Sequence, residues 1–104
     1  MMLKDSFSEF VADQLEGLEG LEIKRMFGGL GLYLKRDFFG ILFQGKLYFK
    51  TNPKTLPRYK AQNSKPFVYS KKGKKTIRLK KYYEVPVDVL EDGKTLKAWA
   101  LQAS

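Results

Sequence analysis

Three closely spaced glycines are the residues of this chain whose spacing most invites a chemical role. They lie in the run Arg25-Met26-Phe27-Gly28-Gly29-Leu30-Gly31-Leu32-Tyr33. A phosphate-binding loop needs backbone N–H groups that converge at the start of a helix, and neither GxGxxG nor GxxxxGK[ST] matches this run. Residues 30–35 instead alternate with period 2, which is typical of a strand. We therefore predict a bend or bulge that enters a hairpin, with no ligand bound on it.

Acid–base and metal chemistry have few candidate residues. The chain has no histidine and no cysteine, so it lacks the commonest metal ligands, the commonest general base and the usual serine triad. Outside the N-terminal helix the carboxylates cluster only at Glu84, Asp88, Glu91 and Asp92. The last two precede a predicted helix, where a negative charge is favourable. We predict no catalytic residue, no metal site and no cofactor, and hence a protein that is not an enzyme.

The charge of the chain is divided by segment. Residues 1–22 carry a net charge of −5, residues 23–81 carry +16, and residues 82–104 carry −2, which gives the formal +9 of the whole chain. We expect the acidic first helix and the basic middle to attract each other within the fold, and Arg25 to form an internal ion pair rather than stay exposed for a partner. The excess positive charge attracts anionic partners.

The densest positive feature is the run Lys71-Lys72-Gly73-Lys74-Lys75, at the tip of a predicted hairpin. Lysines mixed with aromatic residues can bind nucleic acid through phosphate contacts and base stacking. The other interpretation is a solvated hairpin tip whose lysines protect a sheet edge. The candidate contact residues are Lys71, Lys72, Lys74, Lys75, Arg78, Lys80, Lys81, Tyr33 and Tyr48.

The pattern of apolar residues predicts helices grouped around hairpins. A capping box at Ser6 and Glu9 opens a helix over residues 6–18, with Phe7, Phe10, Val11, Leu15 and Leu18 on its apolar face. A short helix ends near Gln62 and starts after Asn52, or later with Thr55 as its cap. Asp92 caps a last helix whose shared face carries Leu96, Trp99, Ala100 and Ala103.

Strands are predicted at residues 30–35, 38–42, 46–50, 66–70 and 74–80. The first of them starts either at residue 30 or before the glycines, at residues 23–27. Pro86 ends the strand region. The order α-β-β-β-α-β-β-α indicates a single two-layer α+β domain over residues 1–104, with an antiparallel sheet.

Turn geometry sets the expected strand registers. A three-residue loop over residues 43–45 places Ile41 opposite Leu47 and buries one coherent apolar face, whereas a two-residue loop places Ile41 opposite Tyr48. We expect the first register. The other face then shows Tyr33, Lys35, Lys46, Tyr48 and Lys50. The same logic places Phe67 opposite Ile77 in the second hairpin.

Taken together, the chain resembles the N-terminal domain of the TfoX (Sxy) family of bacterial competence regulators. The resemblance rests on residues 25–33, 46–50, 66–69, 83–92 and 98–100, in the order and spacing of the family. The residues that mark it are Arg25, Met26, Phe27, Gly28, Gly29, Gly31, Tyr33, Pro86 and Trp99. It implies a fold like that of secretion chaperones and a regulatory role in the expression of DNA-uptake genes. Full-length members carry a second, C-terminal helical domain, and the resemblance leads us to expect a single-domain relative without it.

Two functions follow as expectations. The first is a cytoplasmic, non-enzymatic regulatory or adaptor domain that acts through protein–protein contacts, with a homodimer as one such contact. The alternative is a basic nucleic-acid-binding module with largely non-specific phosphate contacts. No apolar run has the length of a membrane span, so no membrane partner is expected.

Overall fold

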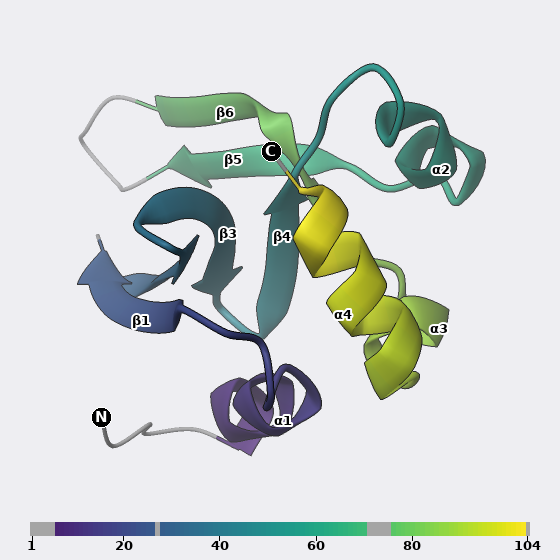
Figure 1. The fold of residues 1–104 in the computed structure, drawn as a ribbon. Helices are drawn as coiled ribbons and strands as arrows, with labels where there is room; N and C mark the ends of the chain where they lie inside the picture. The colour runs from purple at the N-terminus through teal and green to yellow at the C-terminus, as the bar shows by residue number, and fades with distance from the viewer. Residues whose placement is uncertain (1–5, 27, 71–75, 104) are drawn as a thin grey trace.

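A computed structural model describes residues 6–26, 28–70 and 76–103 of the chain. Its helices and strands alternate in groups along the chain (Figure 1). In chain order they are α1 (Ser6–Gln14), β1 (Leu21–Met26), β2 (Gly29–Leu34), β3 (Asp37–Phe43), β4 (Lys46–Lys50), α2 (Leu56–Ala61), β5 (Pro66–Ser70), β6 (Thr76–Glu84), α3 (Val87–Leu90) and α4 (Gly93–Gln102).

The strands form one antiparallel sheet in the order β1-β2-β3-β4-β6-β5, so β1 and β5 are its two edges. The predicted α+β class, antiparallel sheet and element order are confirmed. The strand region around the glycines consists of two strands, β1 and β2, which are the arms of a hairpin. The short helix α3 precedes the predicted last helix and was not expected.

Helix α1 covers one end of the sheet and is shorter than predicted. It ends at Gln14 rather than near residue 18, and Gly17 follows with φ +99°. Val11 and Leu15 are fully buried, whereas Phe10 is 41% exposed and lies off the apolar face to which it was assigned. The amide of Gln14 donates a hydrogen bond of 2.7 Å to the carbonyl of Leu90, which ties α1 to α3.

The starts of α2 and α4 follow local sequence signals. The side-chain oxygen of Asn52 accepts hydrogen bonds from the backbone N–H groups of Lys54 and Thr55. Helix α2 begins after Thr55, so the later of the two predicted starts is confirmed, although the Thr55 side chain makes no capping hydrogen bond. Asp92 accepts from the N–H groups of Lys94 and Thr95 at 3.1 and 3.3 Å. Its predicted role as the cap of the last helix is confirmed.

The register expected for the β3–β4 hairpin is wrong. The loop is the two-residue turn Gln44-Gly45, with φ of +49° and +75°, and Ile41 pairs with Tyr48 rather than with Leu47. A turn with two positive φ values matches the right-handed twist of the flanking strands. The expectation failed because it assumed a single buried face, whereas both faces of this hairpin are buried.

A bulge in β3 distributes its aromatic residues between the two faces. Leu32 pairs with Gly40 and Tyr33 pairs with Phe38, so Phe39 is an extra residue with no partner on β2. An extra residue reverses the alternation of the side chains that follow it. Phe39 therefore packs on the helix side of the sheet, while Ile41 packs on the opposite side.

The register expected for the β5–β6 hairpin is also wrong, by two residues. Phe67 pairs with Leu79, and Ile77 pairs with Tyr69. Because side chains alternate with period 2, a shift of two residues leaves the same set on the same face. The turn itself, residues 71–75, lies outside the described residues.

Two clusters of buried residues lie on opposite faces of the sheet. The helix-side core joins Leu32, Phe39, Leu42, Leu47, Phe49 and Val85 to Val11, Leu15, Tyr59, Val89, Leu96, Ala100 and Ala103 from the helical side. The aromatic core consists of Ile41, Phe43, Tyr48, Phe67 and Tyr82. Figure 1 shows how the second cluster arises, since the β5–β6 hairpin lies across β3 instead of extending the sheet flat.

Candidate functional site

The glycine run forms the β1–β2 hairpin. Met26 pairs with Gly29, and Gly28 has φ +82° in the turn between them. Phe27 lies outside the described residues. Strand β2 begins at Gly29, so this run provides no helix start at which amides could converge on a phosphate. The predicted bend is therefore present, and its shape is that of a hairpin turn.

Arg25 and Met26 point to different environments. Arg25 is exposed, and it makes no ion pair with any carboxylate in the described part of the chain. The ion pair found there joins Lys24 and Glu22 at 3.8 Å, within β1 itself. The expected internal pairing of Arg25, and an attraction between α1 and the basic middle through direct ion pairs, are thus not seen among these residues. Met26 packs against the aromatic core.

Tyr33 and Tyr48 do not form an open stacking face. The Tyr48 ring is 9% exposed and meets the Phe67 ring edge-on, with 5.0 Å between centroids. The Tyr33 ring lies 5.2 Å from Phe38, which in turn lies 5.1 Å from Tyr82. Lys24 Nζ lies over Tyr33, 5.1 Å from its centroid. The β5–β6 hairpin covers the face that was expected to stay open, so these rings contribute mainly to packing.

Burial changes the acidity of two of these phenols. It raises the pKa of Tyr82 to about 12, with a smaller contribution from Tyr33. It also raises the pKa of Tyr48, with Glu84 adding to the effect because a nearby negative charge disfavours the phenolate. Both phenols therefore stay neutral at physiological pH.

Pro86 and Trp99 lie on the helix side of the sheet. Pro86 is the residue before α3 and ends the strand region as predicted. The Trp99 ring meets Tyr59 edge-on at 4.9 Å between centroids, and the Arg58 guanidinium lies 5.7 Å from the indole centroid. Arg58 also donates a hydrogen bond to the side chain of Gln102. These contacts fix α2 against α4.

One end of the molecule carries most of the described positive charge. No Asp or Glu occurs between Asp37 and Glu84, and this segment folds into β4, α2, β5 and β6, of which α2 and the hairpin form one end in Figure 1. We call its described cations from the last residue of β4 onward the basic end: Lys50, Lys54, Arg58, Lys60, Lys65, Arg78, Lys80 and Lys81. The predicted contacts Arg78, Lys80 and Lys81 are exposed there, whereas Lys71, Lys72, Lys74 and Lys75 lie outside the described residues.

Sequence reasoning missed the contribution of α2 to this end. Arg58 and Lys60 are exposed on α2, which lies beyond the end of the hairpin where β5 begins (Figure 1). The signal was available, because the absence of acidic residues extends over the whole segment between Asp37 and Glu84. The search for a dense lysine run favoured the hairpin tip over this longer pattern.

The end opposite the β5–β6 hairpin is acidic. It is formed by helix α1, which carries Glu9 and Asp13 and lies at the far side of the sheet from the hairpin in Figure 1. Asp88 on α3 lies elsewhere, since it lines a pocket with Asn63 and Ser64 of the α2–β5 connection. The molecule therefore has an electric dipole, with its positive end on the side of the β5–β6 hairpin.

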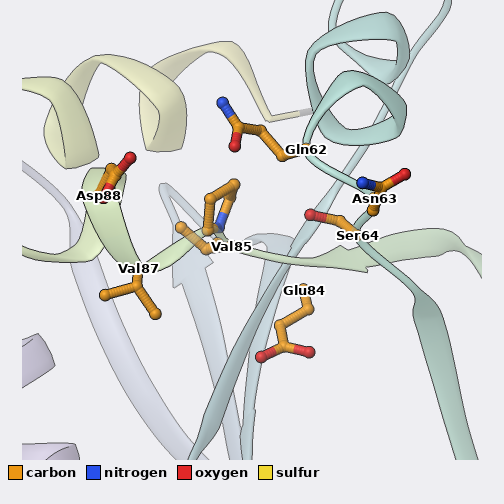
Figure 2. Close-up of a pocket in the computed structure, with 8 residues that line it drawn as sticks. Gln62, Asn63, Ser64, Glu84, Val85, Val87 and Asp88 are labelled. Carbon is orange, nitrogen blue, oxygen red and sulfur yellow. The ribbon is translucent and has the colours of Figure 1, made fainter.

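A shallow pocket of about 310 Å³ lies where the α2–β5 connection meets the β6–α3 connection. Figure 2 shows Glu84 and Asp88 on opposite sides of Val85, with Asn63 and Ser64 across from Asp88. The remaining lining residues are Gln62, Pro86 and Val87. The lining offers amide, hydroxyl and carboxylate groups, but a serine without an adjacent base is not an activated nucleophile.

The Asp92 carboxylate fits a structural role. The pKa of Asp92 is lowered, first by the hydrogen bond from the Thr95 hydroxyl and then by backbone N–H donors, as expected of a helix cap. No group of three or more acidic side chains in residues 6–26, 28–70 and 76–103 is arranged to hold a metal ion. None of the helices in this part of the chain is long and apolar enough to cross a bilayer.

Comparison with known proteins identifies the family of the chain. No curated protein matches the chain. The family profile of the TfoX N-terminal domain matches residues 13–104, which include both hairpins, the basic end and all four helices except the first part of α1. The match thus spans nearly the whole chain, and the chain belongs to the TfoX N-terminal domain family.

Proposed function

We propose that this chain is a non-enzymatic regulatory or adaptor domain that acts by binding other proteins, with a second copy of itself as one partner. Membership of a family named for a competence regulator supports the regulatory role. The structural observation that carries the proposal is the open edge of β1, which is hydrogen-bonded to β2 on one side only.

The sequence of β1 is complementary to itself. In an antiparallel pair of β1 strands centred on Ile23, each Glu22 lies opposite a Lys24 of the other copy, and the two Ile23 residues face each other. Glu22 and Lys24 are exposed, and Ile23 is partly buried against the helix-side core. Opposite charges directly across a strand pair are favourable, and the arrangement has the two-fold symmetry of most homodimers.

The other sheet edge is less suited to self-pairing. Strand β5 lies in the basic end, with Lys65 before it and Arg78 opposite Val68 on its neighbour β6. Two such edges bring like charges together, which opposes association. The dimer is therefore assigned to β1.

Sedimentation velocity of the full chain at micromolar concentration tests the dimer. Lys24→Glu places four carboxylates in the interface and should yield monomers. The double exchange Glu22→Lys/Lys24→Glu restores the cross-strand charge pairs and should restore the dimer. Circular dichroism of each variant checks that the fold is kept.

A wild-type chain that sediments only as monomer contradicts the dimer. A double exchange that stays monomeric while folded contradicts the β1 register. For the wider adaptor role, affinity capture uses extracts of the organism that encodes the chain, prepared under several growth conditions. Failure to retain any protein in stoichiometric amount contradicts that role.

A further inference from the structure

We propose that the basic end binds the phosphate backbone of double-helical nucleic acid without reading its sequence. The inference goes beyond the proposed protein contacts and uses a different surface, since the dimer is assigned to β1. It rests on the distribution of charge over the fold, on the burial of the aromatic rings, and on the positions of individual cations.

The cations of the basic end form no ion pair with a carboxylate among the described residues, although Glu84 lies beside Lys65, whose carbonyl accepts a hydrogen bond from the Glu84 N–H. The ion pair found in this part of the chain is Glu22 with Lys24, which lies on β1. Lys80 and Lys81 are exposed on β6, and Lys50 comes beside them because its neighbour Thr51 donates two hydrogen bonds of 2.7 Å to the Lys81 carbonyl. Exposed, unpaired cations side by side repel one another, and that repulsion is relieved when an anion binds.

The face of the hairpin that carries Arg78 is directed away from the aromatic core. Phe67 and Leu79 form a pair that packs on that core, so the adjacent pair of Val68 and Arg78 lies on the outer face. Val68 is 48% exposed. The outer face of the hairpin thus presents cations around a single small apolar side chain, whereas protein interfaces bury a more extensive apolar centre. This composition favours a polyanion over an acidic protein.

Arg58 extends the surface onto α2 in a fixed orientation. Its guanidinium lies over the Trp99 ring and donates a hydrogen bond to Gln102. A guanidinium held in place loses less side-chain entropy when it meets a phosphate. Because Trp99 is the single tryptophan of the chain, its fluorescence reports an event at Arg58 directly.

The available rings favour a duplex over a single strand. Single strands bind by stacking their bases on exposed aromatic rings. The rings first considered for this role are not free to stack, since Tyr48 is 9% exposed and Tyr33 lies against Phe38. A duplex presents phosphates at twice the density of one strand and needs no stacking partner. The acidic end faces away from the bound polyanion and orients the domain on it (Figure 1).

Fluorescence anisotropy of the full chain with a labelled DNA duplex of arbitrary sequence tests the proposal. A duplex of about 24 base pairs is about twice as long as the 40 Å dimension of the domain. If four phosphates are neutralised, the affinity should fall about 100-fold between about 50 mM and about 200 mM salt. Trp99 emission should change as the duplex binds.

Two variants with the same net charge distinguish binding by the basic end from a general effect of the total charge of the protein. Lys80→Gln/Lys81→Gln removes two cations from the basic end, and Lys94→Gln/Lys97→Gln removes two from α4 at its acidic side. The first should weaken binding at about 50 mM salt about tenfold and reduce the salt slope by about 2, while the second should change the affinity less than about twofold.

Several results overturn the proposal. Absence of binding at low salt removes it, and equal loss in the two variants shows that no defined surface is used. Tighter binding of the corresponding single strand would show that the protein binds single strands by base stacking instead of duplexes through their phosphates. Equal competition by polyglutamate shows that the surface takes acidic polypeptide as readily as a duplex. None of these results depends on whether β1 forms the dimer.

Discussion

The ring of Phe43 on β3 meets the ring of Phe67 on β5 edge-on, with 5.5 Å between their centroids. In the order of the sheet, β4 and β6 lie between these two strands. Rings on strands so far apart can touch only if the sheet curls back on itself. The contact therefore shows that the sheet curls. The curl closes the aromatic core and buries Tyr48.

Replacing Phe67 by Ala should destabilise the domain strongly. Phe67 is fully buried and also contacts Tyr48 at 5.0 Å between ring centroids, so the change leaves a cavity in the aromatic core. We expect a loss of about 3–5 kcal/mol in the free energy of unfolding. Urea titration followed by Trp99 fluorescence measures it. Val68→Ala, at the exposed neighbour, should change the stability by less than about 0.5 kcal/mol, and equal effects of the two would contradict the curled sheet.

Local signals in the sequence were sufficient to predict most of the elements and the cap of the last helix. The Asp92 side chain, the start of α2 after Thr55 and the hairpin at Gly28 each depend on residues close together in the chain. Such features follow from the geometry of one turn. The order of the elements and the α+β class then follow from the sequence of these local choices.

The registers and the site depend on contacts that the local sequence does not encode. Ile41 pairs with Tyr48 because both faces of the β3–β4 hairpin are covered, and the cover on one face comes from Phe67, far along the chain. No pattern in the sequence marks Phe39 as the extra residue of a bulge. The basic end likewise required the fold, since only the folded chain brings α2, which carries Arg58, and the hairpin, which carries Arg78, to one end of the molecule.

Replacing Gly29 by Ala should also lower the stability of the domain, although the change adds a single methyl group. A Cβ at Gly29 would overlap the carbonyl oxygen of Leu42 and lie 2.9 Å from Cδ1 of Phe43, so backbone must move to admit it. We expect a loss of about 1–3 kcal/mol, as for an overpacked core, measured by thermal unfolding. Gly93→Ala in the first turn of α4 is the matched control, since Ala favours a helix by up to about 1 kcal/mol over Gly. A loss at Gly93 as large as that at Gly29 would contradict the close approach.

High pH should unfold the domain through its buried phenols. The pKa of Tyr82 is raised to about 12 in the folded state by burial and, less, by Tyr33, and burial also raises the pKa of Tyr59. The unfolded chain ionises these phenols near pH 10. Their contribution to stability is therefore complete below pH 10 and is lost as the pH rises toward 12.

Tyr82→Phe removes one of these ionisations. Between pH 10 and 12 the free energy of unfolding should then fall less steeply with pH, because unfolding releases up to about one proton fewer than in the wild type. The absorbance of the phenolate reports ionisation directly. An unchanged slope in a folded Tyr82→Phe variant would show that Tyr82 ionises equally in the folded and unfolded states.

The turn between β3 and β4 offers a change that should stabilise the domain. Gln44 has φ +49° and is exposed, with Gly45 at φ +75° after it. Asn tolerates this left-handed conformation better than Gln, and Asn-Gly is the preferred pair for a turn of this type. Gln44→Asn should raise the free energy of unfolding by about 0.5 kcal/mol and the Tm by about 2–4 °C. Gln44→Val, which adds a β-branched residue at positive φ, should lower the stability by about 1–2 kcal/mol. If both variants matched the wild type in calorimetry, Gln44 would not hold the left-handed conformation, and the three-residue loop with Ile41 opposite Leu47 would regain support.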